Sequence, residues 1–112
     1  MKIGYVYIVS NNNRTTFYIG VTNDIKRRTM EHKAGVGAKF TSKYNLTDLL
    51  FYEEFNNIKT AIAQEKRLKN WHREWKINLI KSINPNMEDI AKDWFTKEQI
   101  EERKRDSETS LE

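Results

Sequence analysis

The sequence predicts a small α+β domain, in which helices pack on a three-stranded, mainly antiparallel sheet. Three short runs rich in β-branched and aromatic residues, at 5–9, 17–21 and 48–55, are typical of strands. Two segments, at about 24–34 and 58–83, carry helical signals. A length of 112 residues fits one domain, and we find no internal repeat.

The first two strands are expected to form a β-hairpin. Residues 5–9 read Tyr-Val-Tyr-Ile-Val and residues 17–21 read Phe-Tyr-Ile-Gly-Val, and the residues between them are mostly Asn, Ser and Thr. Gly20 weakens the second strand. A glycine there indicates a bulge or a close approach of the backbone to another group.

A helix over about 24–34 should follow, because Asn23 and Asp24 supply N-cap chemistry. Gly35 and Gly37 are expected to end it. Residues 38–47 look like a polar loop. The third strand follows at 48–55.

A long helix is expected over about 58–83, since its apolar residues recur at helical spacing and Asn84-Pro85 ends the pattern. The residues that share this face are Ile58, Ala61, Ile62, Leu68, Trp75 and Leu79. The pattern of residues 86–95 predicts a short amphipathic helix. Residues 96–112 are expected to form a charged, partly helical tail. We therefore divide the chain into a domain at 1–85 and a C-terminal segment at 86–112, and treat the final Leu111-Glu112 as a cloning remnant.

Charge is distributed unevenly. Residues 1–85 hold 15 Lys/Arg and 7 Asp/Glu, whereas residues 86–112 hold 5 and 9, so the net charge of +4 divides into +8 and −4. A basic body suggests an anionic partner, and a solvated lysine-rich surface is the alternative.

The composition excludes several classes of protein. The absence of cysteine excludes a disulfide scaffold, a thiolate zinc site and a Cys nucleophile. No apolar run approaches the roughly 20 residues that cross a bilayer, and the N-terminus lacks a signal-peptide pattern. We expect a cytoplasmic protein that does not contact membranes.

Glu65 is the first candidate site residue. At about 100° per residue it falls inside the apolar stripe of the long helix. A carboxylate there is costly unless it is paired or binds a metal. One interpretation is a buried salt bridge, and the other is a single carboxylate that holds a divalent ion together with water and phosphate oxygens.

Arg28 and His32 lie four residues apart and share a helix face with Ile25. A guanidinium at that position can clamp a phosphate, and an imidazole can move a proton near neutral pH. A solvated basic face over 26–28 is the alternative.

Tyr7 and Tyr18 are expected to lie near each other across the hairpin. Packing is the plain interpretation of both rings. A tyrosine acts as a base only if its pKa of about 10 is lowered, for which a nearby arginine or metal-bound water would serve.

Basic residues are concentrated at 59–81. This segment contains seven Lys/Arg and only two Glu, with Trp71 and His72 among the basic residues. Lys39, Lys43 and Tyr44 extend this pattern. Such a pattern suits a phosphate backbone and unstacked bases, with a solvated helix face as the alternative.

Taken together, these residues resemble the GIY-YIG nuclease superfamily over about residues 4–83. Val6-Tyr7-Ile8 stands at the first motif and Tyr18-Ile19-Gly20 is the second. Arg28 and His32 follow Tyr18 by ten and fourteen residues, at the positions of the family's arginine and frequent histidine, and Glu65 matches its metal-binding glutamate.

The chain is most similar to small stand-alone bacterial members close to the Holliday-junction resolvase branch. Some positions depart from the family. Tyr5 stands where glycine is usual, Val21 where the excision-repair branch has lysine, and residues 39–44 lack the histidines of some relatives. Members of this kind usually use an appended domain for target choice, whereas residues 86–112 are acidic, so a protein partner or targeting subunit is a further expectation.

The resemblance implies hydrolysis of DNA phosphodiester bonds with one Mg²⁺ or Mn²⁺ at Glu65, leaving 5′-phosphate and 3′-hydroxyl ends. Tyr7 would act as the base or orient water, Arg28 would stabilise phosphoryl charge, and Tyr18 and His32 would bind phosphate or relay a proton. Branched or damaged DNA, and hence DNA repair, is the expected setting. The residues expected to contact nucleic acid are Arg27, Lys39, Lys43, Lys66, Lys69 and Arg73.

Two alternatives stay open. The first is a DNA- or RNA-binding module of the same fold without useful turnover. The second is a protein-interaction domain whose acidic tail covers the basic face until a partner displaces it.

Overall fold

A computed structural model describes residues 2–109, so Leu111-Glu112 lies outside the described part of the chain. It contains one antiparallel sheet in the order β2-β1-β3. The strands are β1 (Gly4–Ser10), β2 (Phe17–Thr22) and β3 (Asp48–Phe55). The predicted α+β class and all three strands are confirmed.

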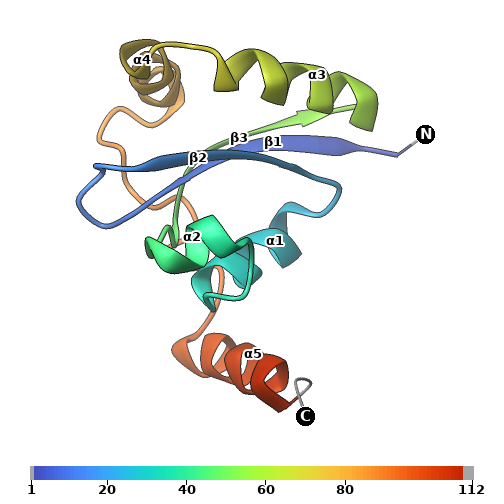
Figure 1. Cartoon of the computed structure of the whole chain (residues 1–112), viewed down its shortest axis with the longest axis vertical. Coiled ribbons are helices and arrows are strands. Elements are labelled where there is room, and N and C mark those ends of the chain that lie inside the picture. Colours follow the sequence, from blue (N-terminus) through green and yellow to red (C-terminus); the bar gives the residue numbers. More distant parts are fainter. Residues whose placement is uncertain (1, 110–112) are drawn as a thin grey trace.

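The sheet forms the middle layer of the molecule, with helices on both faces (Figure 1). On one side lie α1 (Ile25–Lys33) and α2 (Lys39–Lys43), and on the other α3 (Ile58–Lys69) and α4 (Arg73–Ile83). Successive strand residues point to opposite faces. Val6 and Ile8 therefore pack in a core with α3 and α4, whereas Tyr7 and Val9 pack in a second core with α1.

The prediction of one long helix over 58–83 was wrong, because the chain breaks between α3 and α4. A straight helix of that length would extend about 39 Å, well beyond the roughly 24 Å of the seven-residue β1. The break allows both Leu68 and Ile80 to reach the same core. Trp75 is consequently displaced from the expected apolar stripe and is 54% exposed.

The amphipathic helix predicted over 86–95 is also absent. Side chains in this segment instead bind the backbone of β3 and of the segment itself. Asn84 donates to the carbonyl of Leu50, and Asp89 accepts from the amides of Leu49 and Ala91. These turns place Ala91 in the α1-side core without a helix. The division of the chain at residue 85 stays a prediction, although this segment packs against the sheet.

Residues 38–47, expected as a polar loop, include the short helix α2. Ala38 precedes it, and the Thr41 hydroxyl bonds back to both the amide and the carbonyl of Ala38, which closes the turn. The loop prediction failed because this local bond depends on one threonine within a polar segment.

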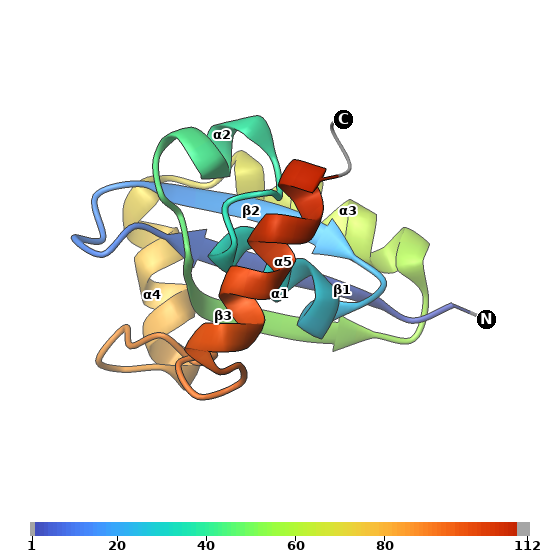
Figure 2. The same ribbon diagram turned by 90° about the horizontal axis from the view of Figure 1, so that it is seen from below.

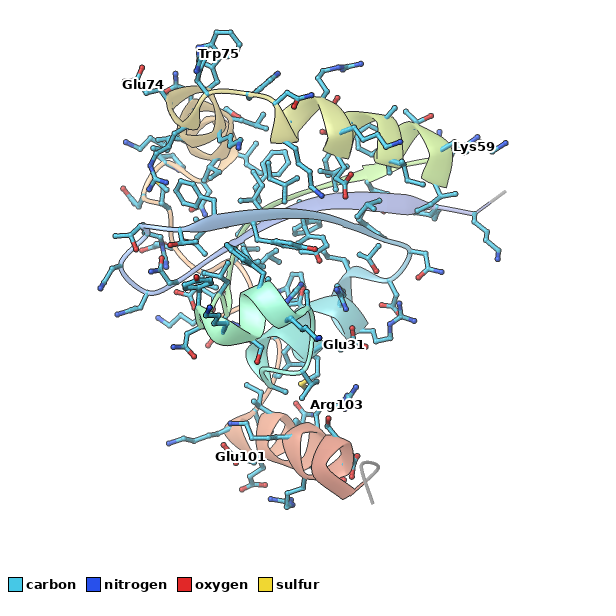
Figure 3. The ribbon with its side chains drawn as sticks, viewed as in Figure 1. Glu31, Lys59, Glu74, Trp75, Glu101 and Arg103 are labelled. Carbon is cyan, nitrogen blue, oxygen red and sulfur yellow. The ribbon has the colours of Figure 1, made fainter. Side chains whose placement is uncertain are left out.

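The C-terminal helix α5 (Lys97–Thr109) lies across α1, as Figure 2 shows from below. Arg103 of α5 and Glu31 of α1 face each other at 3.9 Å (Figure 3). Helix α5 therefore does not cover α3, which lies on the opposite side of the sheet, and the covering of a basic face by the acidic tail stays a prediction. No helix among the described residues is long and apolar enough to span a membrane.

Candidate active site

Tyr7 lies at the centre of β1, with its side chain 1% exposed. Its hydroxyl bonds to Nε2 of His32 at 2.8 Å and accepts a hydrogen bond from Nε of Arg28 at 3.2 Å. Three residues singled out from the sequence thus meet at one oxygen atom. The meeting point is where the middle of the sheet faces α1.

Helix α1 presents Arg28 and His32 because its start and register are well determined. The Asp24 carboxylate accepts from the amide of Arg27, which caps the helix, and Ile25 is buried against the sheet. Residues three and seven positions after Ile25 then lie on the same face. The predicted helix over 24–34 is confirmed to within a residue at each end.

Thr41 determines which nitrogen of His32 carries the proton. The Thr41 hydroxyl lies 3.0 Å from Nδ1 and donates its own hydrogen to the carbonyl of Ala38. It can therefore only accept from His32, which places the proton on Nδ1. Nε2 is left as an acceptor, and the Tyr7 hydroxyl donates to it while it accepts from Arg28.

Two glycines leave the space that this cluster needs. A Cβ on Gly20, the β2 partner of Tyr7, would stand 2.4 Å from Cζ and Oη of the Tyr7 ring. A Cβ on Gly37 would stand 2.6 Å from Nδ1 of His32. The close approach expected at Gly20 is confirmed, and the group that approaches is the tyrosine itself.

Burial controls the protonation of the cluster. Burial and, to a smaller extent, the charge of Arg28 together lower the pKa of His32 to about 4, with Glu31 opposing them, so the imidazole is neutral at pH 7. Burial also raises the pKa of Tyr7 to about 12, although the hydrogen bond from Arg28 opposes this. The lowered tyrosine pKa that a free base would need is therefore not found. Tyr7 keeps its proton and shares it with His32.

Arg28 is held in place by Glu31, which it contacts through Nη1 at 2.9 Å. This carboxylate and the hydrogen bond to Tyr7 raise the pKa of Arg28, although burial acts against them. The arginine is thus charged throughout the physiological range. Its Nη2 makes no hydrogen bond within the described residues, and the side chain faces a groove.

Tyr18 connects this cluster to the other face of the sheet. Its ring lies 6.5 Å from that of Tyr7 and 6.1 Å from that of His32. Because β2 is an edge strand, Lys69 of α3 reaches around the edge, and its Nζ lies 5.9 Å from the centre of the Tyr18 ring. The same Nζ pairs with Oε2 of Glu65 at 3.3 Å.

Glu65 sits between the buried Ala61 and Leu68 on α3, and its side chain is 15% exposed. Its one ion pair among the described residues is the pair with Lys69. No group of three or more His, Asp or Glu that could hold a metal ion occurs in the described part of the chain. A lone, half-buried carboxylate at an open edge suits Mg²⁺, which keeps most of its waters and takes oxygens from a phosphate.

Two grooves run along the open edge of β2. The first has a volume of about 480 Å³ and is lined in part by Arg27, Arg28 and Ile62. The second, of about 320 Å³, is lined by Phe17, Tyr18, Ile19, Phe40, Lys69 and Lys76. Glu65 is three residues after Ile62 and four before Lys69, so it lies on α3 between the two grooves.

The residues expected to contact nucleic acid are only partly brought together. Arg27 and Lys69 line the grooves, and the guanidinium of Arg73 lies 4.5 Å from the centre of the Phe17 ring. Lys39 and Lys43 instead line a separate hollow on α2 beside Ser107 of α5. Lys66 is exposed on α3 and lines neither groove.

Sequence reasoning missed three residues of the site. Thr41 and Phe40 lie in the segment expected to be a loop, and Glu31 is one of many charged residues on α1. A threonine and an aromatic residue in a polar segment give no distinctive local signal.

The sequence of the chain is similar to a known family and to proteins of several organisms. The GIY-YIG catalytic domain matches residues 3–78. A UPF0213 protein of Haloquadratum walsbyi is 39% identical over 75 residues, which cover 67% of this chain and 83% of that protein. One of Clostridium perfringens is 32% identical over 91 residues, or 81% of this chain and 97% of that protein.

A solved structure agrees with these similarities. The solution structure of a UPF0213 protein from Bacillus halodurans superposes with a TM-score of 0.51 at 29% identity. The match covers 84% of this chain and 99% of that one. The fold and the order of the motifs therefore point to the same group of proteins.

Proposed function

Because the chain belongs to the GIY-YIG catalytic-domain family, a family of nucleases, we propose that it is a divalent-metal-dependent endonuclease that hydrolyses DNA. One observation carries the proposal. The hydroxyl of Tyr7 lies between a neutral His32 and a charged Arg28, and it keeps one lone pair for a further partner.

That further partner is the attacking water. Tyr7 accepts a proton from the water while its own proton passes to Nε2 of His32, and Thr41 holds the Nδ1 proton of the resulting imidazolium. The water oxygen bonds to phosphorus, and the bond to the 3′-oxygen breaks. The products are a 5′-phosphate and a 3′-hydroxyl, whose oxygen takes its proton from solvent.

Arg28 contributes in two ways. Its unpaired Nη2 is available to the phosphoryl oxygens, on which negative charge develops. A phosphate bound beside Arg28 also offsets the charge that helps to lower the pKa of His32. His32 thus becomes a better proton acceptor when substrate is present than it is in the free protein.

Glu65 is the residue that would hold Mg²⁺ or Mn²⁺, and the bound ion would stabilise the leaving 3′-oxygen. Lys69 pairs with this carboxylate in the free protein. The same lysine can move to a phosphate oxygen when the carboxylate is occupied. The proposal therefore needs one carboxylate and one ion.

The test is a nicking assay on supercoiled plasmid and on synthetic branched DNA, with Mg²⁺, Mn²⁺ or EDTA. Metal-dependent cutting by the natural protein that is lost in Glu65→Ala would support the proposal. Glu74→Ala, which removes an exposed carboxylate from α4, is the matched control and should cut normally. Intact DNA under all metal conditions would reject it.

A second function, nucleic-acid binding without turnover, is favoured by the burial of Tyr7. Tyr7, the proposed general base, is 1% exposed, so the sheet edge at β2 must open somewhat before water can reach its hydroxyl. Binding that weakens steeply with salt, with no cutting in any metal, would support this alternative.

A further inference from the structure

The second groove, which we call the Phe40 groove, is lined by Phe17, Tyr18, Ile19, Phe40, Lys69 and Lys76. Apart from Tyr18 and Lys69, these residues have no role in the chemistry proposed above. The groove lies along the open edge of β2, where no further strand pairs. Tyr18 belongs both to this groove and to the Tyr7–His32 cluster. Whatever binds in the groove therefore lies next to the phosphate that is to be cut.

Aromatic rings form one wall of the groove and continue onto α2. The rings of Tyr18 and Phe40 are stacked, 6.2 Å apart with 29° between their planes. The centre of the Tyr44 ring lies 4.8 Å from the centre of the Phe40 ring. Phe40 remains 44% exposed and Tyr44 45% exposed, so contact between the rings does not hide them from water. Helix α2 thus presents two partly exposed aromatic rings beside the site.

Positive charge surrounds these rings. The charged residues that line the groove are Lys69, which also pairs with Glu65, and Lys76. Arg73 covers the ring of Phe17. The groove therefore combines ring faces, on which a base can stack, with cations that attract the sugar-phosphate backbone. A paired duplex cannot use the rings, because its bases are stacked on one another.

We propose that the Phe40 groove binds an unpaired nucleobase, so that the protein selects nucleic acid with an unpaired nucleotide beside the phosphate it cuts. The inference rests on the proposed function for the position of that phosphate. The base stacks on Phe40, and Lys69 and Lys76 contact the adjoining phosphates. Single strands, flaps and frayed ends carry this feature, and uniform duplex does not.

The test measures binding in EDTA, so that it does not depend on cleavage. A fluorescent 12-nucleotide single strand and the matching duplex serve as ligands, and a second single strand carries 2-aminopurine as a stacking probe. The natural protein should bind the single strand more tightly and quench the 2-aminopurine. Phe40→Ala should weaken single-strand binding about tenfold and abolish the quenching, with duplex binding unchanged.

Two further variants separate stacking from general effects. Phe40→Leu keeps apolar bulk but has no ring, and it should behave as Phe40→Ala does. Trp75→Ala removes an aromatic side chain that is 54% exposed on the outer side of α4 and away from the groove (Figure 3), and it should bind normally.

Equal loss of single-strand and duplex binding in Phe40→Ala, no loss of either, or the same loss in Trp75→Ala would each overturn the inference. Failure of the proposed function looks different. In that case no DNA is cut in any metal, while binding of the single strand still depends on Phe40. If DNA is cut but single-strand binding ignores Phe40, the nuclease proposal stands and this inference fails.

Discussion

On the α1 side of the sheet the candidate site is centred on a buried, hydrogen-bonded pair, Tyr7 and His32, whereas on the α3 side it is more open and has one ion pair among the described residues. Tyr7 and His32 are each 1% exposed and are joined through Thr41 to the backbone of α2. Glu65 and Lys69 are attached to the rest of the protein by their helix and by the ring of Tyr18.

Under the proposed function, this contrast corresponds to a division of roles between the two sides of the sheet. Groups that must hold one orientation are built into the core, where folding fixes them before substrate arrives. Groups that must exchange partners, from each other to an ion and a phosphate, lie at the surface. Substitutions on the α3 side should therefore change activity alone, and those on the α1 side should change activity and stability together.

The largest effect is expected for Glu65→Gln, which we predict lowers cleavage about 10³-fold or more, because the ion loses its one carboxylate ligand. Stability should change little, since a pair of this kind within one helix, whose lysine is half exposed, contributes no more than about 1 kcal/mol. Cleavage rates and thermal melting of the same preparation test this. A large drop in melting temperature would contradict the contrast between the two sides.

Gly20→Ala should affect both properties, because its Cβ would collide with the Tyr7 ring in the core. Overpacking of this kind costs about 1–3 kcal/mol, and the displaced hydroxyl should lose contact with His32. Urea denaturation and cleavage assays measure the two effects. Gly35→Asn is the control, since Gly35 has open space and a φ of 73° that Asn tolerates. Normal activity in Gly20→Ala would show that the ring is not held by packing.

The neutral, buried His32 predicts acid-sensitive stability. The unfolded imidazole binds a proton below its ordinary pKa of 6.5, whereas the folded one stays neutral down to about 4. Stability should therefore fall as the pH drops through this window, by about 3 kcal/mol in all. Denaturation at several pH values should show this loss in the natural protein and in His72→Gln, which alters the exposed histidine. If His32→Gln loses stability in the same window to the same extent, the burial argument is wrong.

The smallest effect is expected for Thr41→Val. The Nδ1 proton of His32 would lose its acceptor, at a cost of about 1 kcal/mol, and cleavage should fall about tenfold as the second tautomer becomes populated. Nitrogen NMR of the imidazole reports the tautomer directly, and Thr41→Ser should restore both tautomer and rate. An unchanged Nδ1-protonated imidazole in Thr41→Val would remove Thr41 from the relay.

Most of the sheet and the start of α1 were predictable, because they depend on local signals. Short runs of β-branched and aromatic residues predicted β1, β2 and β3, and Asp24 predicted the start of α1. Helical spacing also brought Arg28 and His32 to one face, and placed Glu65 between buried neighbours. The helix prediction over 86–95 failed because this segment bonds to the backbone of β3, far away in the sequence. The break at 70–72 and the short helix α2 within 38–47 were missed as well.

The sequence by itself determined the strands, the cap of α1 and the order of the tyrosine, arginine, histidine and glutamate motifs, since each is set by residues within a few positions. Only the tertiary structure decided the tautomer of His32, the raised pKa of Tyr7 and the groove at the edge of β2. Those properties arise from burial and from contacts such as Thr41 with His32 and Lys69 with Tyr18. They exist only in the folded protein, where residues from both faces of the sheet meet at the edge formed by β2.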